Sequence, residues 1–225
     1  MNFKMSVLKN YKKLIQNIKA SCKIYNRNFE RINLVAVSKQ QALEKIKILI
    51  RNGHTCFGEN RLDEAKTKWK DIDKKNIKLH FIGALQSKKV REVIKFFDVI
   101  ETLDTERAAR KLSLLQSEGI KLPQIFIQIN IGEEVQKRGV CPSEFSDFLN
   151  LCRDKYSLDI SGAMCMPPNK LNPNKYFKDM LNICTKEKIE DISMGMSSDY
   201  KEAIINGANN IRIGSLLFGE REKNN

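Results

Sequence analysis

Short apolar runs alternate with longer amphipathic stretches along most of this sequence, and this alternation restricts the possible folds more than any other feature. The apolar runs are four to seven residues long and bounded by turn residues, which is typical of buried strands. The eight predicted strands are Asn33–Ser38, Thr55–Gly58, Leu79–Gly83, Val99–Thr102, Gln124–Asn130, Leu158–Met164, Ile192–Gly195 and Asn210–Gly214. Strands that alternate with helices predict a parallel sheet covered by those helices.

Eight such units in 225 residues correspond to about 28 residues each, the spacing of a closed (β/α)8 TIM barrel. An open, doubly wound sheet is the alternative. Apolar residues recur at helical spacing before the first strand, so we expect an extra N-terminal amphipathic helix whose apolar face is formed by Val7, Leu8, Tyr11, Leu14, Ile15 and Ile18. No Gly-, Ser- or Pro-rich linker divides the chain, and we therefore expect one α/β domain over residues 1–225.

Glycines and small polar residues mark the predicted helix ends. Glycine commonly follows the last turn of a helix, whereas Ser and Asp commonly precede the first. Helices are predicted to end at Gly53, Gly119 and Gly207 and to begin at Ser87, Asp104 and Ser198.

Composition argues against several classes of protein. The six cysteines are scattered singly and the chain has only two histidines, so we expect no metal site and reduced thiols. There is no apolar run of about 18 residues and no secretory signal, which predicts a cytoplasmic protein without a membrane span. The net charge of +13 is spread along the chain, so we expect no specific nucleic-acid partner.

A lysine, Lys39, follows the apolar run of the first predicted strand. Active sites of such barrels lie at the carboxyl ends of the strands. Partial burial there lowers the pKa of an amine, and only the neutral amine attacks an aldehyde to form a Schiff base. The alternative is that Lys39 extends along the apolar surface to solvent.

The ends of strands seven and eight carry glycine and serine, the residues expected of a phosphate site. In these barrels phosphate commonly binds at the loops after these two strands. Gly214 permits close approach of the backbone, and hydroxyls and N–H groups at Ser197, Ser198 and Ser215 can donate to phosphate oxygens. Either segment alone is equally consistent with ordinary helix capping.

Three further polar residues are candidates for the same site. Arg212 lies two residues before Gly214 and so points to the same side of its strand; it either faces the ring of a ligand or forms a salt bridge. Asn60, after strand two, either contacts the cofactor or caps a helix. His80 is either a core or a pocket residue, and Cys56 is expected near the mouth.

The motifs VAVSK, FGEN, HFIG-x-LQS, SMGMS-x-D-Y-x-x-A-I and RIG-[ST]-x-x-F-G occur in this order. From about Leu34 to Arg221 the chain resembles the pyridoxal-phosphate homeostasis proteins. The resemblance implies a single barrel like the alanine racemase N-terminal domain, with pyridoxal 5′-phosphate as a Schiff base on Lys39. It also implies phosphate contacts at Ser197, Ser198, Gly214 and Ser215 and a ring-nitrogen contact at Arg212. Lys88, Lys137 and Arg138 depart from the family's pattern.

The resemblance implies a cofactor carrier or buffer, with no catalytic residues, that makes transient contact with apo-enzymes. Racemases with this barrel require a second acid–base group from an additional domain and a dimer partner. We expect a monomer without such a domain, in which Tyr176 and Tyr200 have no assigned role. The alternative is a pyridoxal-phosphate-dependent racemase or lyase of low activity.

Overall fold

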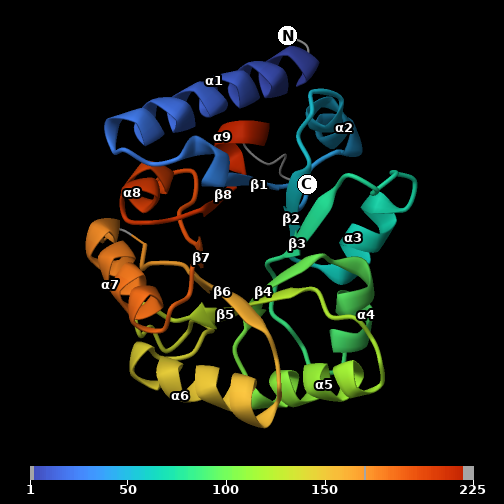
Figure 1. The fold of residues 1–225 in the computed structure, drawn as a ribbon. Coiled ribbons are helices and arrows are strands. Elements are labelled where there is room, and N and C mark those ends of the chain that lie inside the picture. The colour runs from blue at the N-terminus through green and yellow to red at the C-terminus, as the bar shows by residue number, and fades with distance from the viewer. Residues whose placement is uncertain (1–2, 170, 220–225) are drawn as a thin grey trace.

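The computed structural model describes residues 3–169 and 171–219. Eight parallel strands form one closed barrel in sequence order, and β8 pairs with β1 to close it (Figure 1). The strands are β1 (Asn33–Val37), β2 (Cys56–Glu59), β3 (Lys78–Phe81), β4 (Val99–Leu103), β5 (Gln124–Ile129), β6 (Ile160–Cys165), β7 (Asp191–Ser193) and β8 (Asn210–Ile213). Each lies within two residues of its predicted range, so the barrel is confirmed and the open sheet is wrong.

Helices surround the barrel (Figure 1). They are α1 (Phe3–Ile24), α2 (Leu43–Arg51), α3 (Leu62–Trp69), α4 (Val90–Phe96), α5 (Glu106–Ser117), α6 (Phe145–Asn150), α7 (Pro173–Lys186), α8 (Tyr200–Ile205) and α9 (Ser215–Phe218). Short 3₁₀ helices at Phe29–Arg31 and Pro142–Glu144 and a π-helical turn at Leu151–Lys155 complete the described elements. None of the helices in the described ranges is long and apolar enough to cross a membrane.

Alternation along each strand separates an apolar outer layer from a more polar interior. In β8, Ile211 and Ile213 belong to the buried apolar cluster beneath the helices. Arg212 between them points the other way, into the barrel, because successive strand side chains face opposite sides. His80 takes the same position in β3, between Leu79 and Phe81 of the cluster. The polar side chains of the candidate site therefore come from the inner face.

The predicted helix ends agree with the structure, whereas the predicted starts do not. Gly53, Gly119 and Gly207 have φ of +81°, +80° and +101°, a region that favours glycine. The residues that precede α4, α5 and α8 are Lys89, Thr105 and Asp199, and the predicted caps Ser87, Asp104 and Ser198 are wrong by one or two positions. Hydrogen-bonded turns at 86–89 and 196–199 delay the first helical residue of α4 and α8.

The predicted N-terminal helix is present as α1 and packs against α2, α8 and α9 (Figure 1). Of the predicted apolar face, Val7, Leu14 and Ile18 are buried, whereas Leu8, Tyr11 and Ile15 are half-buried. After α1, the guanidinium of Arg27 donates hydrogen bonds to the carbonyl oxygens of Ile204, Gly207 and Ala208 at 3.0–3.2 Å. These bonds satisfy carbonyls at the end of α8, so the N-terminal segment stabilises the last β/α unit.

Candidate functional site

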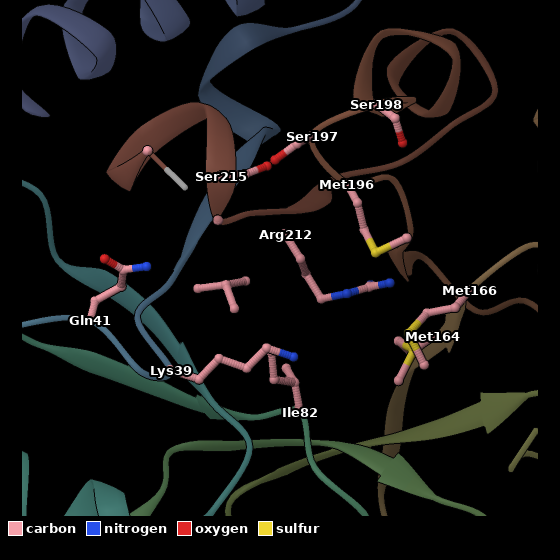
Figure 2. A pocket seen from close by; sticks show the side chains of 13 residues that line it. Lys39, Gln41, Ile82, Met164, Met166, Met196, Ser197, Ser198, Arg212 and Ser215 are labelled. Carbon is pink, nitrogen blue, oxygen red and sulfur yellow. The ribbon is translucent and has the colours of Figure 1, made fainter. Parts of the chain in front are cut away.

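A pocket of about 430 Å³ opens at the carboxyl ends of the strands (Figure 2). Six predicted cofactor-binding residues line it: Lys39, Ser197, Ser198, Arg212, Gly214 and Ser215. The remaining lining residues are Val37, Gln41, Ile82, Met164, Met166, Met196 and Gly219. Segments that are far apart in the sequence thus meet around one cavity with apolar walls.

Asn60 is the one predicted site residue that does not line this pocket. It borders a separate depression with Phe81, Ala84 and Lys89. β2 ends at Glu59, so strand alternation no longer fixes the direction of the Asn60 side chain. A role of Asn60 in cofactor binding stays a prediction.

The buried carboxylate of Glu59 anchors the loop that carries Lys39, through a hydrogen bond to Ser38. Ser38 Oγ donates to Glu59 Oε1 at 2.8 Å, and Glu59 has no exposed surface. Lys68 Nζ donates to Glu59 Oε1 at 3.0 Å and to the Ser38 carbonyl oxygen at 2.7 Å. Burial raises the pKa of Glu59, although Lys68 opposes this. These bonds hold Ser38, and with it the backbone on which the Lys39 side chain stands.

Lys39 and the serines approach the pocket from different sides. In Figure 2 the Lys39 side chain extends towards Ile82 and Arg212, while Ser197 and Ser215 lie on the other side of Arg212. The Leu216 N–H donates to Ser197 Oγ at 3.3 Å, which joins the loop after β7 to the start of α9. The two serine loops therefore form one wall.

A glycine shapes that wall. Gly195 has φ of +89°, and a Cβ at this position would lie 2.4 Å from the Ala203 Cβ. Only glycine combines this backbone conformation with such close packing on α8. The conformation of Gly195 thus sets the path of the loop bearing Ser197 and Ser198.

Arg212 forms the salt bridge that the sequence gave as one alternative and also lines the pocket, and its contact with the ring of a ligand stays a prediction. Its side chain lines the pocket, and Nη1 lies 3.6 Å from Glu101 Oε2. Nη1 also donates to Ser193 Oγ at 2.6 Å, and Nη2 donates to the Cys165 carbonyl oxygen at 2.8 Å. Glu101 and Ser193 were not predicted from the sequence; their inward positions on β4 and β7 were the available signal.

Two other expectations are settled by strand direction and burial. His80 is a core residue: it is 2% exposed and its Nδ1 lies 2.6 Å from Glu101 Oε1. Cys56 was expected near the mouth of the pocket; this is wrong, because Cys56 begins β2 and so lies at the end of the barrel opposite the pocket.

Within residues 3–169 and 171–219, no group of three His, Cys, Asp or Glu side chains could hold a metal ion.

Two of the three departures from the family pattern are neutralised locally. Arg138 donates to both carboxylate oxygens of Asp104, at 2.7 and 2.9 Å. Lys137 forms an ion pair with Glu134. Lys88 lies apart from them and lines a shallow groove beside α5. The extra charges at positions 137 and 138 therefore add little net field at the mouth.

The residues around the pocket suit a small aromatic aldehyde that carries an anionic group. Lys39 offers a primary amine, while Ser197, Ser198 and Ser215 offer hydroxyl donors. Arg212 supplies a permanent cation, and methionine and aliphatic side chains supply apolar contacts for a ring. Of the described residues that line the pocket, only Lys39 and Arg212 carry titratable groups.

Comparison with known proteins agrees with this architecture. Residues 10–222 match the family model described as alanine racemase, N-terminal domain. The chain is 33% identical to a pyridoxal phosphate homeostasis protein of Haemophilus influenzae, over 96% of this chain and 97% of that one.

Solved structures agree as well. PipY of Synechococcus elongatus, solved with pyridoxal phosphate bound, has a TM-score of 0.74 at 27% identity, covering 91% of this chain and all of PipY. A Clostridium difficile alanine racemase shares the fold at TM-score 0.72 and 17% identity; the match covers 98% of this chain but 57% of the racemase. This chain belongs to the family of pyridoxal phosphate homeostasis proteins, whose barrel is that of the alanine racemase N-terminal domain.

Proposed function

We propose that this protein binds pyridoxal 5′-phosphate as a Schiff base on Lys39 and holds it reversibly, as a carrier or buffer of the cofactor. One observation carries the proposal: Lys39 and the wall formed by Ser197, Ser198 and Ser215 border the same pocket of about 430 Å³. The cofactor found in PipY and the names of the relatives support this ligand. We further propose that the one barrel over residues 1–225 is sufficient for binding.

Each part of the pocket has a distinct task in this proposal. The hydroxyls of Ser197, Ser198 and Ser215 bind the phosphate, and Gly214 lets the backbone approach it. Met164 and the other apolar side chains contact the faces of the ring. When bound, the cofactor supplies an aldehyde that condenses with an amine with loss of water.

We propose that Arg212, which lines the pocket, lies opposite the ring nitrogen of the cofactor, and this contact favours a carrier over an enzyme. A guanidinium opposite the ring nitrogen disfavours protonation of that nitrogen, which weakens the ring as an electron sink. None of the described residues that line the pocket is a Tyr, His, Cys, Asp or Glu that could serve as a second acid–base group. Tyr200 is 5% exposed and lies on α8, outside the pocket lining.

Covalent binding is tested by absorbance and trapping. Purified protein loaded with the cofactor should absorb in the visible range, and Lys39→Ala should remove this band while Lys88→Ala retains it. Borohydride reduction followed by peptide mapping should label Lys39. A label on a different residue, or a protein that binds no cofactor, contradicts the proposal.

The carrier role needs a separate experiment. Holo-protein should reactivate an apo-enzyme in the presence of a scavenger of free cofactor, and Lys39→Ala protein should not. Failure to reactivate any apo-enzyme contradicts the carrier role. The alternative, a racemase or lyase of low activity, predicts turnover of one amino acid above the rate with free cofactor, and a broad amino-acid panel tests it.

We propose a cytoplasmic monomer that contacts apo-enzymes transiently and has no specific nucleic-acid partner. The six cysteines form no disulfide, which supports a reducing compartment. Sedimentation of the holo-protein tests the monomeric state. Fluorescence anisotropy with labelled nucleic acid at physiological salt tests the lack of a specific nucleic-acid partner.

A further inference from the structure

A chain of four buried polar side chains crosses the barrel interior beneath the pocket. Its members stand on four strands: His80 on β3, Glu101 on β4, Ser193 on β7 and Arg212 on β8. All four are at most 5% exposed. Only Arg212 reaches the pocket, so the other three act on a ligand through it.

The contacts converge on the carboxylate of Glu101. Its Oε1 lies 2.6 Å from His80 Nδ1, and its Oε2 accepts a hydrogen bond from Ser193 Oγ at 2.6 Å. Ser193 Oγ in turn accepts from Arg212 Nη1 at 2.6 Å. The hydroxyl thus bridges the two charged groups, which themselves lie 3.6 Å apart.

This arrangement determines where the guanidinium can lie. One nitrogen, Nη1, is held by Ser193 and Glu101, and Nη2 is held by the carbonyl oxygen of Cys165 on β6, two strands away from β8. A planar guanidinium restrained at two nitrogens keeps one orientation. A long side chain without these partners has several rotamers.

The charges of the chain are interdependent. Burial raises the pKa of Glu101, but the lowering by His80, Arg212 and Ser193 is larger. The pKa therefore lies below its ordinary value, and this carboxyl is ionised. Burial lowers the pKa of His80, whereas Cys56 and Glu101 raise it, to about 10. Two cations therefore share one buried anion, and replacement of Glu101 by a neutral residue would leave both unpaired.

We propose that Glu101 and Ser193 are positioning residues that fix Arg212 against the ring nitrogen of the cofactor, and that His80 orients Glu101. This inference rests on the proposed function, since it presumes pyridoxal phosphate in the pocket. The alternative is that the four residues only stabilise the barrel. If the role of Glu101 is purely structural, its replacement should weaken cofactor binding by the same factor in the wild type and in an Arg212→Ala variant.

A double-mutant cycle separates these two roles. The dissociation constant of pyridoxal phosphate is measured by absorbance titration for wild type, Glu101→Gln, Arg212→Ala and the double variant. We expect Glu101→Gln to weaken binding by roughly 10-fold or more, the effect of losing one charge-assisted contact. In the Arg212→Ala background the same change should alter binding less than about twofold. An equal factor in both backgrounds overturns the proposal.

A spectroscopic readout complements the cycle. With Glu101 neutral, the positive field of Arg212 at the ring is uncompensated, so the pH midpoint of the absorbance change of bound cofactor should fall. Glu92→Gln is the matched control: it makes the same change in an exposed carboxylate on α4 that pairs with Lys66, and it should leave the midpoint unchanged. A midpoint unaltered in Glu101→Gln contradicts the proposal.

Ser193→Ala keeps the inference testable if Glu101→Gln fails to fold. It removes the bridging hydroxyl and retains both charges. In a double-mutant cycle with Arg212→Ala, it should weaken cofactor binding in the wild-type background and have little effect once Arg212 is replaced. Additive effects of Ser193→Ala and Arg212→Ala overturn the proposal. These results are distinct from failure of the proposed function, in which wild-type protein itself binds no cofactor or labels a residue other than Lys39.

Discussion

The guanidinium of Arg212 and the carboxylate of Glu101 lie 3.6 Å apart inside the barrel, and both side chains are at most 5% exposed. The cation at the wall of the pocket is therefore held by a residue that the ligand cannot touch. Lys39 is supported in a similar way, since buried Glu59 and Lys68 bind the adjacent Ser38. Both titratable groups of the pocket thus depend on partners behind its surface.

The serine wall should determine the preference for a phosphorylated ligand. Ser197→Ala and Ser215→Ala should each weaken binding of pyridoxal phosphate by roughly 10- to 100-fold, the cost of one hydrogen bond to a charged group. Binding of unphosphorylated pyridoxal should change little, and affinity titrations with both ligands give the ratio. Ser87→Ala is the control, because Ser87 lines a different groove and should leave the affinity for both ligands unchanged. An equal loss for both ligands would contradict this assignment.

The ion pair beneath the Lys39 loop should be worth far more than an exposed pair on the same helix. Lys68→Met leaves the carboxylate of Glu59 buried without its cation, which should cost about 3 kcal/mol of unfolding free energy. Lys66→Met removes an ion pair with Glu92 whose side chains are 44% and 55% exposed, so the cost should be below about 1 kcal/mol. Urea unfolding of both variants measures the difference. Similar losses would show that Glu59 does not require Lys68.

Two glycines with similar φ should respond differently to alanine. Gly53 has φ of +81° and open space around it, so Gly53→Ala should cost about 1 to 2 kcal/mol from backbone strain alone. Gly195→Ala adds a Cβ 2.4 Å from that of Ala203 and should cost roughly twice as much or more. It should also weaken binding of pyridoxal phosphate, because the loop bearing Ser197 must shift. Thermal unfolding and affinity titration test both effects; equal costs would contradict the packing argument.

Acid should destabilise the protein through His54. Its ring packs against Tyr11 and Phe57, and Nε2 donates to the Cys56 carbonyl oxygen at 2.7 Å. Burial lowers the pKa of His54 to about 4, below the value of about 6.5 in the unfolded chain. The stability from the neutral ring is thus fully present above pH 6.5 and is lost as the pH falls through 4.

His54→Phe retains the ring contacts and removes the titration. Between pH 6.5 and 4, wild type should lose up to about 3 kcal/mol more unfolding free energy than this variant. Urea midpoints measured at several pH values give both slopes. Carboxylates contribute equally to the two proteins, so parallel slopes would show that His54 does not titrate in this range.

The sequence by itself determined the eight strands and therefore the barrel. Runs such as Gln124–Ile129 are apolar and short because both faces of a barrel strand are buried, and this pattern survives in the sequence. The same logic located Lys39, Ser197 and Ser215, since every parallel strand ends at the same face. The side-chain direction of residues just beyond a strand, such as Asn60, was less predictable, because the in–out alternation of side chains ends with the strand.

Only the tertiary structure decided how the buried polar groups pair. Glu101 and Arg212 are 111 positions apart, and nothing local to either indicates the other. The closed barrel brings the inner faces of β4, β7 and β8 together, and because its interior excludes water, each charge there must find a partner. The periodicity of the chain determined which side chains point inward, and closure of the barrel determined which of them meet.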